Sequence, residues 1–329
     1  MSNMSKLDFV SIGEVMIQLN SITPGPLRYA RYFEVHVAGS EANVMIGLSK
    51  LGYRTGFITR VGGDEFGEMI LRTLRGEGVD ITHVRVMKDA PTGIYFVQRH
   101  YPIPGKSTVF YYRHLSAASY MDESDVSEEY IGSSRALFLT GITPALSESC
   151  YRAFRKALEV ARSSGVDIII DTNIRLKLWK TPERAREALL PMIRDAKILI
   201  TNKEDLAILF PETSNIREPV KKLLDQGIEI VVVKKGEEGS ELYTRDGREA
   251  IEKAINVPII EDVIGAGDAF DAALLASLYR GLEPSQALKY ANIAGALVVT
   301  VRGDIEAQPT WEVLEIMSKY LKERLEYIR

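Results

Sequence analysis

The 329-residue chain lacks most features that would place it outside ordinary globular proteins. Its single cysteine, Cys150, excludes an intramolecular disulfide framework and any multi-cysteine metal site. Its four histidines do not have the spacing of metal ligands. No apolar run approaches the roughly 18–20 residues of a membrane span. Polar residues such as Glu14 and Gln18 interrupt the N-terminal apolar stretch, so we also expect no signal peptide.

A strong excess of charge of one sign is absent as well. The 41 Lys and Arg residues against 45 Asp and Glu give a net charge of −4, which argues against a protein that mainly coats nucleic acid or anionic membrane. With 46% hydrophobic and 26% charged residues, the composition is globular rather than disordered. We expect a cytoplasmic protein without nucleic-acid or membrane partners, built as two domains or one large α/β unit.

Short apolar runs alternate with helical patterns over most of the chain. The runs predict buried strands at residues 9–12, 55–61, 166–170, 198–201 and 228–233. Helices are predicted at residues 40–51, 65–74, 268–280, 284–301 and 310–326, the first with Ser40 as its N-cap. Continuous apolar strands between helices are typical of a parallel sheet covered on both faces. The pattern therefore predicts a doubly wound α/β fold.

Two segments break this rhythm, at residues 16–37 and 92–115. Both are rich in Tyr, Phe, Val and Thr, contain turn signals and lack helical periodicity. We expect antiparallel strands that form a small sheet inserted into the α/β body.

Three motifs resemble known sites but lack the required context. Gly105-Lys106-Ser107 resembles the end of a P-loop, but His100 stands where the earlier glycine is needed. The run 62–66 spells the diguanylate cyclase signature, yet it links a strand to a helix, whose start Asp64 favours electrostatically. After the first strand, Gly13 alone does not make a dinucleotide-binding motif.

The most informative segment is 262–270, which reads Asp-Val-Ile-Gly-Ala-Gly-Asp-Ala-Phe. A glycine-rich turn at the start of a helix exposes backbone N–H groups and the positive end of the helix dipole, which together bind phosphoryl oxygens. Asp268 would then lie beside the group being transferred. A plain N-cap aspartate after a turn is the alternative, although capping does not require both glycines.

A second segment, 38–43, reads Ala-Gly-Ser-Glu-Ala-Asn. Gly39 would let a ligand approach the backbone, and Asn43 would offer a donor and an acceptor from the first turn of its helix. A helix start with a polar surface residue would have the same sequence, so this segment alone leaves both interpretations open.

Together these segments resemble the ribokinase-like sugar kinases, the phosphofructokinase-B family. The N-terminal motif of that family matches residues 39–43, a Gly-x-Asp-type element matches 63–67, and the C-terminal signature matches 262–268. The resemblance covers nearly the whole chain. It implies one ribokinase-like domain over 1–329, a mostly parallel doubly wound sheet, and a β-sheet lid at about 14–37 and 90–115. It also implies that ATP phosphorylates a hydroxymethyl group with Mg²⁺.

The resemblance also implies roles for individual residues. Asp268 corresponds to the catalytic base, and Gly265, Ala266 and Gly267 to the anion hole. The groups that would bind ATP are Asn173, Asn292 and the turn containing Lys235, Gly236 and Gly239. A plain hairpin is the alternative for that turn, and a solvated helix residue for Asn292. In the family's Asn-x-x-Glu element, which organises Mg²⁺ through water, this chain has Asn202 and Asp205, with Glu204 beside them.

The substrate is predicted from two arginines. Arg113 lies on the second lid segment and Arg175 follows a core strand, and guanidinium groups pair with carboxylates through two parallel hydrogen bonds. With Gly39, Asn43, Tyr95, Tyr111 and Asp304, this set resembles the 2-keto-3-deoxygluconate kinases, which act on a sugar acid. The galactonate epimer of that acid is a second candidate substrate. Surface salt bridges are the alternative for both arginines. A kinase for fructose or a nucleoside, or a sugar-binding regulator, would share the motifs. We expect a homo-oligomer through the lid, because exposed strand edges tend to pair.

Overall fold

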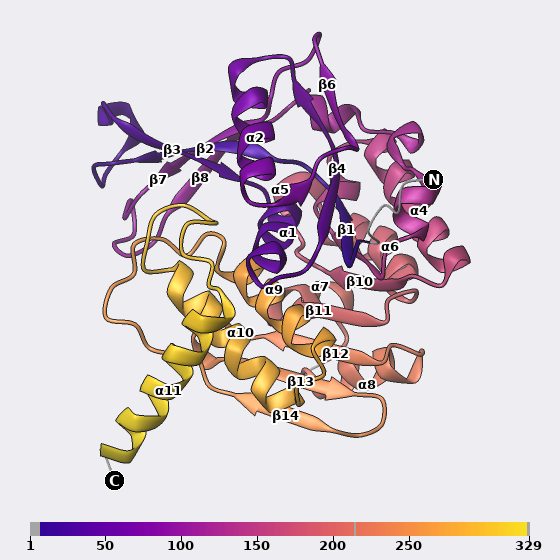
Figure 1. Cartoon of the computed structure of the whole chain (residues 1–329), viewed down its shortest axis with the longest axis vertical. Coiled ribbons are helices and arrows are strands. Elements are labelled where there is room, and N and C mark those ends of the chain that lie inside the picture. Colours follow the sequence, from indigo (N-terminus) through magenta and orange to yellow (C-terminus); the bar gives the residue numbers. More distant parts are fainter. Residues whose placement is uncertain (1–6, 214, 328–329) are drawn as a thin grey trace.

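The computed structural model describes residues 7–213 and 215–327. In these ranges the larger of two sheets has ten strands and is mostly parallel (Figure 1). Its parallel strands, in order across the sheet, are β12 (Ile230–Lys234), β11 (Ile198–Asn202), β10 (Asp167–Asp171), β9 (Ala136–Thr140), β1 (Phe9–Ile12), β4 (Thr55–Gly62) and β5 (Val79–Asp80), with β6 (Val84–Met87) also paired to β4. β13 (Ser240–Thr244) and β14 (Glu249–Glu252) extend it antiparallel beyond β12. The predicted fold class is confirmed.

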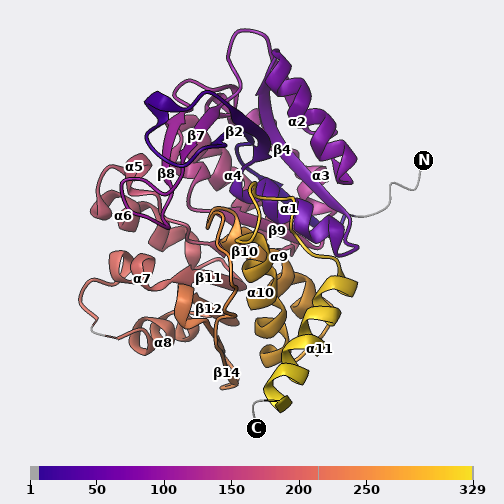
Figure 2. The ribbon, with the colours of Figure 1, turned by 90° about the vertical axis from the view of Figure 1, so that its left-hand side faces the viewer.

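Helices cover both faces of this sheet (Figure 2). One layer contains α1 (Ser40–Lys50), α2 (Glu65–Gly76), α9 (Ala266–Tyr279), α10 (Pro284–Val298) and α11 (Trp311–Tyr327). The other contains α3 (Glu128–Gly132), α4 (Glu148–Ser164), α6 (Pro182–Ile193), α7 (Lys203–Leu209) and α8 (Arg217–Asp225). Successive strand residues point to opposite layers: Phe9 packs into the first core and Val10 into the second. No helix in the described ranges is long and apolar enough to cross a bilayer.

The two irregular segments form a four-stranded sheet beside the large one (Figure 1). Its order is β3 (Phe33–Ala38), β2 (Met16–Ser21), β7 (Ile94–Gln98) and β8 (Thr108–Tyr112). The expectation that all its strands are antiparallel is wrong, because β2 and β7 pair in parallel. The reason is the route of the chain: β2 follows β1 and β7 follows β6, and both of those strands run parallel to β4.

The predicted N-cap of the first helix is also wrong. Gly39 is the capping residue, and Ser40 is already the first residue of α1. The Ser40 hydroxyl does not cap the helix, because it donates to Asp268 instead. At α2, by contrast, Asp64 accepts from the backbone N–H of Gly67, so the structural interpretation of that motif is confirmed.

Small residues bring α1 close to α9. A Cβ atom at Gly47 would lie 2.6 Å from the Cβ of Ala272, so a larger residue would not fit between the two helices without a shift. Asn43 is one turn before Gly47 on α1, and Asp268 is one turn before Ala272 on α9. The same crossing therefore places Asn43 opposite Asp268.

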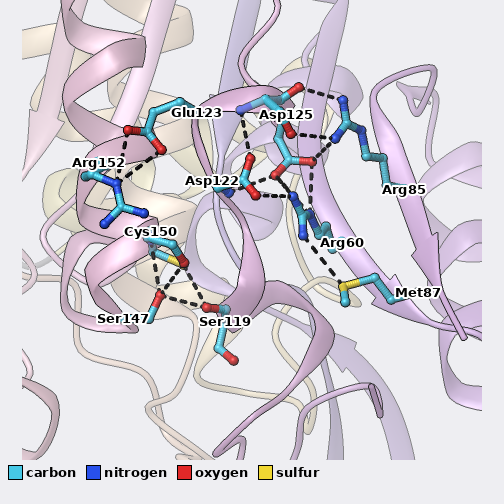
Figure 3. A network of polar contacts seen from close by, with 12 residues as sticks. Arg60, Arg85, Met87, Ser119, Asp122, Glu123, Asp125, Ser147, Cys150 and Arg152 are labelled. Atoms are coloured by element: carbon cyan, nitrogen blue, oxygen red, sulfur yellow. Dashed lines mark hydrogen bonds and ion pairs between the residues drawn. The ribbon is translucent and has the colours of Figure 1, made fainter. Parts of the chain in front are cut away.

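The chain that leaves β8 is tied to the body by a polar network (Figure 3). The Arg60 guanidinium of β4 donates to Asp122 and Asp125, each at 2.9 Å. Nearby, the buried Cys150 thiol of α4 donates to the carbonyl oxygen of Ala118 at 3.3 Å. Burial raises the pKa of Cys150 to about 11, so this thiol stays protonated and has a packing role.

Candidate active site

Several predicted site residues, together with Glu14 and Thr143, lie where the parallel strands end. Glu14 follows β1, Thr143 follows β9 and Asn173 follows β10. Asn202 is the last residue of β11, and Lys235 follows β12. The chain runs from β1 to β4 on one side and to β9 on the other, so strand order reverses at β1. The carboxyl edge at such a reversal is where open α/β sheets bind ligands.

The glycine turn lies at the N-terminus of α9. Gly265 is the N-cap residue with φ 79°, and a Cβ there would lie 2.9 Å from the Cα of Asp304, so both conformation and space require glycine. No side chain caps this helix, which leaves its first N–H groups available to an anion. Gly267 is exposed, so the turn faces open space.

Asp268 is half-buried in the first turn of α9. Its carboxylate accepts hydrogen bonds from the Ser40 hydroxyl and the Asn43 amide, both at 2.7 Å. Asn173, predicted to bind ATP, donates to Ser40 at 2.9 Å and so extends the same chain. Burial raises the pKa of Asp268, and the bonds from Ser40 and Asn43 together with the Lys234 charge partly offset that rise. The site thus holds an oriented carboxylate beside a free helix N-terminus.

Asp304 lies next to this carboxylate and is almost fully buried. Its oxygens accept from the Gln18 amide at 2.9 Å and the Asn43 amide at 3.0 Å, while the Tyr95 hydroxyl is 3.4 Å away. Burial raises the pKa of Asp304 to about 7, and the nearby Asp268 charge adds to the rise. Asn43 therefore bridges two carboxylates, since its amide donates to both.

The two predicted carboxylate-binding arginines have different surroundings. Arg113 forms a buried ion pair with Glu14, to which its Nε donates at 2.6 Å, and its guanidinium lies 5.4 Å from the Tyr111 ring centre. The alternative of a surface salt bridge therefore does not describe Arg113. Arg175 is exposed at the start of α5 (Leu176–Trp179). Its side chain is thus accessible to a ligand.

The predicted nucleotide-binding turn is the β12–β13 hairpin. The Lys235 ammonium donates to Glu241 at 2.8 Å. Gly239 has φ 106°, and a Cβ there would overlap the carbonyl oxygen of Glu252. Asn292 of α10 donates to that same carbonyl at 3.4 Å and accepts from Ser240 at 3.2 Å. Asn292 thus joins α10 to both hairpin strands and is not a free surface residue; Gly236 lies at the open end of the turn.

Asn202 and Asp205 lie at the start of α7. Asn202 caps the helix by accepting from the backbone N–H of Asp205 at 2.8 Å. Asp205 is buried, and one of its oxygens accepts from Thr172 at 2.6 Å and from the Ile174 N–H at 3.0 Å. Glu204 is exposed on the helix. Burial raises the pKa of Asp205 and neighbouring Asp171 adds to the rise, while Lys234 lowers it. Because Lys234 is already paired with Asp171 and Asp271, this edge has an excess of carboxylates over cations.

That excess fits a divalent cation held through water. The described residues contain no group of three or more His, Cys, Asp or Glu side chains arranged to bind a metal directly. Mg²⁺ prefers oxygen ligands and keeps several of its waters, so an inward carboxylate and an amide at this edge are suitable outer contacts.

Sequence reasoning missed four polar residues of the site. Ser40 and Gln18 contact Asp268 and Asp304, Glu14 pairs with Arg113, and Lys234 bridges Asp171 and Asp271. Ser40 lies within the motif at residues 38–43, so the sequence could have predicted that it belongs to the site. Nothing in the sequence pairs the other three with partners far along the chain.

Comparison with known proteins identifies the family. The model of the pfkB family carbohydrate kinases matches residues 6–311. The chain belongs to this family. The kinase is 44% identical over 322 residues to a 2-dehydro-3-deoxygluconokinase from Thermoproteus tenax, covering 96% of this chain and 95% of that protein. It is also 31% identical to a 5-dehydro-2-deoxygluconokinase from Clostridium perfringens, covering 98% and 95% of the two chains.

Solved structures agree with this assignment. The kinase superimposes on a putative ribokinase II from E. coli in complex with ATP and Mg²⁺ with a TM-score of 0.88 and 26% identity, covering 95% of this chain and 99% of that chain. A 2-dehydro-3-deoxygluconokinase from Thermotoga maritima gives a TM-score of 0.83 at 26% identity, with the same coverage. The chain is thus a carbohydrate kinase with the ribokinase-like fold.

Proposed function

We propose that this kinase transfers the γ-phosphoryl group of ATP to the terminal hydroxyl of 2-keto-3-deoxygluconate. The observation that carries the proposal is the 44% identity, over nearly the whole chain, to a 2-dehydro-3-deoxygluconokinase, which is a kinase of this sugar acid. The Clostridium relative is also named for a keto-deoxy sugar acid. The exposed Arg175 supplies positive charge that such a substrate needs, whereas the Arg113 charge is paired with Glu14.

The reaction needs a base and an anion hole, and the site residues fit both. The Asp268 carboxylate takes the proton of the terminal hydroxyl of the substrate. The oxygen of that hydroxyl forms the new bond to phosphorus. The bond from phosphorus to the bridging oxygen breaks, and ADP leaves. The backbone N–H groups of Gly265, Ala266 and Gly267, at the start of α9, stabilise charge on the transferred group. A loose transition state asks little of the base, so positioning dominates.

Asn202 and Asp205 are the residues that would hold Mg²⁺ through water. When bound, Mg²⁺ neutralises charge on the phosphate oxygens. Gly39, Asn43, Tyr95, Tyr111 and Asp304 would contact the sugar acid, and Asn173, Lys235, Gly236, Gly239 and Asn292 would line the nucleotide site. Support comes from their contacts: Asn43 and Tyr95 both reach Asp304, and Asn292 holds the hairpin that contains Gly239.

We further propose that the four-stranded sheet is a lid over the sugar site and that it pairs across subunits. Its site-facing side carries Gln18, Tyr95 and Tyr111, which share one face by register. An ATP-consuming enzyme needs a compartment that supplies ATP, which supports a cytoplasmic location.

The substrate is tested with a panel of sugars and sugar acids assayed for ADP release with ATP and Mg²⁺. The panel includes 2-keto-3-deoxygluconate, its galactonate epimer, 5-dehydro-2-deoxygluconate, fructose, ribose and a nucleoside. We expect the highest kcat/KM on the first compound. Turnover confined to fructose or a nucleoside would replace the proposal with a neutral-sugar kinase, and binding without turnover would favour a regulator.

Asp268→Asn tests the base. The amide keeps the size and one acceptor of the carboxylate, so we expect substrate binding to persist while kcat falls about 10²–10⁴-fold, the usual contribution of a general base. Steady-state kinetics and calorimetric ATP binding on the same preparation separate the two effects. Turnover near the parent value would remove Asp268 from the role.

A further inference from the structure

A largely buried lysine lies beneath the glycine turn. The Lys234 ammonium group, at the end of β12, donates to Asp171 at 2.9 Å and to Asp271 at 3.0 Å. Both aspartates are almost fully buried. A Cβ atom at Gly267 would lie 3.6 Å from the lysine nitrogen. The charge of Lys234 is therefore next to the anion hole.

The three residues belong to three elements that carry the site. Asp171 ends β10, which leads to Asn173; Lys234 ends β12, which leads to the nucleotide turn; Asp271 lies one turn after Asp268 on α9. Within the described ranges, Lys234 is the only cation that contacts either aspartate. The Asp171 Oδ1 atom is buried and has no hydrogen-bond partner there. The packing of α9 against the sheet thus depends on this one cation for its charge balance.

We infer that Lys234 is a positioning residue for phosphoryl transfer, holding the first turn of α9 and the Asp268 carboxylate in register with the ends of β10 and β12. The inference rests on the proposed function, in which the glycine turn and Asp268 act on the phosphoryl group. Lys234 touches neither substrate in this assignment. Its effect is exerted through the three elements that it joins and through its charge beneath the turn.

The charge effect can be measured because Asp268 is surrounded by few ionisable groups. Ser40 and Asn43 from α1 face it as hydrogen-bond donors. The ionisable groups near it are Asp304 from the loop after α10, Asp171 from β10, Lys234 from β12 and Asp271 from its own helix. Lys234 is the one positive charge among them. It lowers the pKa of Asp268, whereas Asp171 raises it. Removing Lys234 must therefore move the titration of Asp268 to higher pH.

The test compares Lys234→Met with the parent. We expect kcat on the best sugar acid to fall by up to roughly 100-fold, the cost of about 1 Å of misplacement. We expect the acid limb of the kcat/KM profile to move up by roughly 0.5–1 pH unit. This shift of the acid limb is limited because Asp171 and Asp271, having lost their cation in Lys234→Met, take up a proton. ATP affinity, measured by calorimetry without sugar, should weaken roughly 3- to 30-fold.

Lys197→Met is the matched control. Lys197 pairs with Asp167 at 2.9 Å, and Asp167 accepts from Tyr279 at the far end of α9. This lysine thus joins the same strand and the same helix at their opposite ends. If Lys234 only packs, both variants will lose similar stability and keep the parent pH profile and ATP affinity, and the inference is wrong.

Asp271→Asn keeps the question answerable if Lys234→Met does not fold. This variant removes one of the two carboxylates that Lys234 joins and keeps the lysine charge. We therefore expect kcat and ATP affinity to fall as in Lys234→Met, while the acid limb does not move to higher pH. Parent values of kcat and ATP affinity, or an acid limb moved to higher pH, would overturn the inference. A parent that binds ATP but phosphorylates no sugar acid would refute the proposed substrate alone, since the ATP affinities of the variants still report on Lys234.

Discussion

The carboxyl group of Asp304 makes folding itself dependent on pH. Its pKa is raised to about 7 by burial, whereas an unfolded aspartate titrates near 3.9. Between these values the folded chain binds the extra proton, so the contribution of Asp304 to stability is favourable at low pH and declines as pH rises towards 7. At neutral pH the buried Asp304 carboxylate therefore lowers the stability of the fold. A role in the sugar site would explain why an aspartate occupies this position.

Asp304→Asn tests this linkage. The variant has no carboxyl group at this position to titrate, so its unfolding free energy should not fall with pH as that of the parent does. The unfolding free energy of the variant minus that of the parent should therefore increase between about pH 4 and about pH 7, by up to ~1.4 kcal/mol per pH unit. Above about pH 7 the difference should level off. Urea unfolding at a series of pH values measures the difference. A difference that does not change with pH would show that Asp304 titrates normally.

Arg175→Ala tests recognition of the acid. Arg175 is exposed at the start of α5, so truncation costs little packing. We expect the sugar acid to bind about 1.5–3 kcal/mol more weakly, the value of hydrogen bonds to a charged group, with little effect on a neutral sugar. Arg184→Ala, an exposed arginine on α6, is the control. Equal losses on acid and neutral substrates would refute the carboxylate contact.

At the scale of elements, the sequence predicts what is local. The strand and helix positions follow from apolar runs, caps and glycines, and the observed α2 ends at Gly76 as its glycine indicates. The glycine turn at 265–267 is also a local signal. Three features depend on distant partners and were not predictable: the parallel pairing of β2 with β7, the Arg113–Glu14 pair, and the Gln18 contact to Asp304. Each joins segments whose approach is fixed by the tertiary fold.

Gly47→Ala tests the helix crossing that aligns Asn43 with Asp268. The added methyl would lie 2.6 Å from the Ala272 Cβ and overlap Gln308, so α1 must move away from α9. We expect a loss of about 1–3 kcal/mol in stability and a fall in kcat of roughly tenfold or more. Thermal unfolding and steady-state kinetics measure both.

Two further variants make that result specific. Gly76→Ala at the end of α2 meets open space, so it should be neutral or slightly stabilising. Adding Ala272→Gly to Gly47→Ala removes the clashing methyl group and should restore part of kcat. If Gly47→Ala is active and stable without this second change, the close approach of the helices does not position the site.

For the whole molecule, the unpaired surface of the four-stranded sheet is the feature that bears on assembly. Register puts Leu19, Phe96 and Phe110 on the side opposite Gln18 and Tyr95. Phe110 and Tyr112 are exposed on β8, which is an edge strand of this sheet. An apolar edge of this kind favours pairing with another chain.

We therefore expect a dimer or larger homo-oligomer in light scattering of the parent chain. Phe110→Glu places a charge on the outer side of β8, where it would be desolvated on association, so it should shift the mass towards the monomer while the fold is kept. Tyr320→Glu, which changes an exposed aromatic residue on α11, controls for the loss of any surface ring. A monomeric parent would contradict assembly through this sheet, and equal dissociation by both variants would locate the contact elsewhere. Circular dichroism of each variant separates dissociation from unfolding.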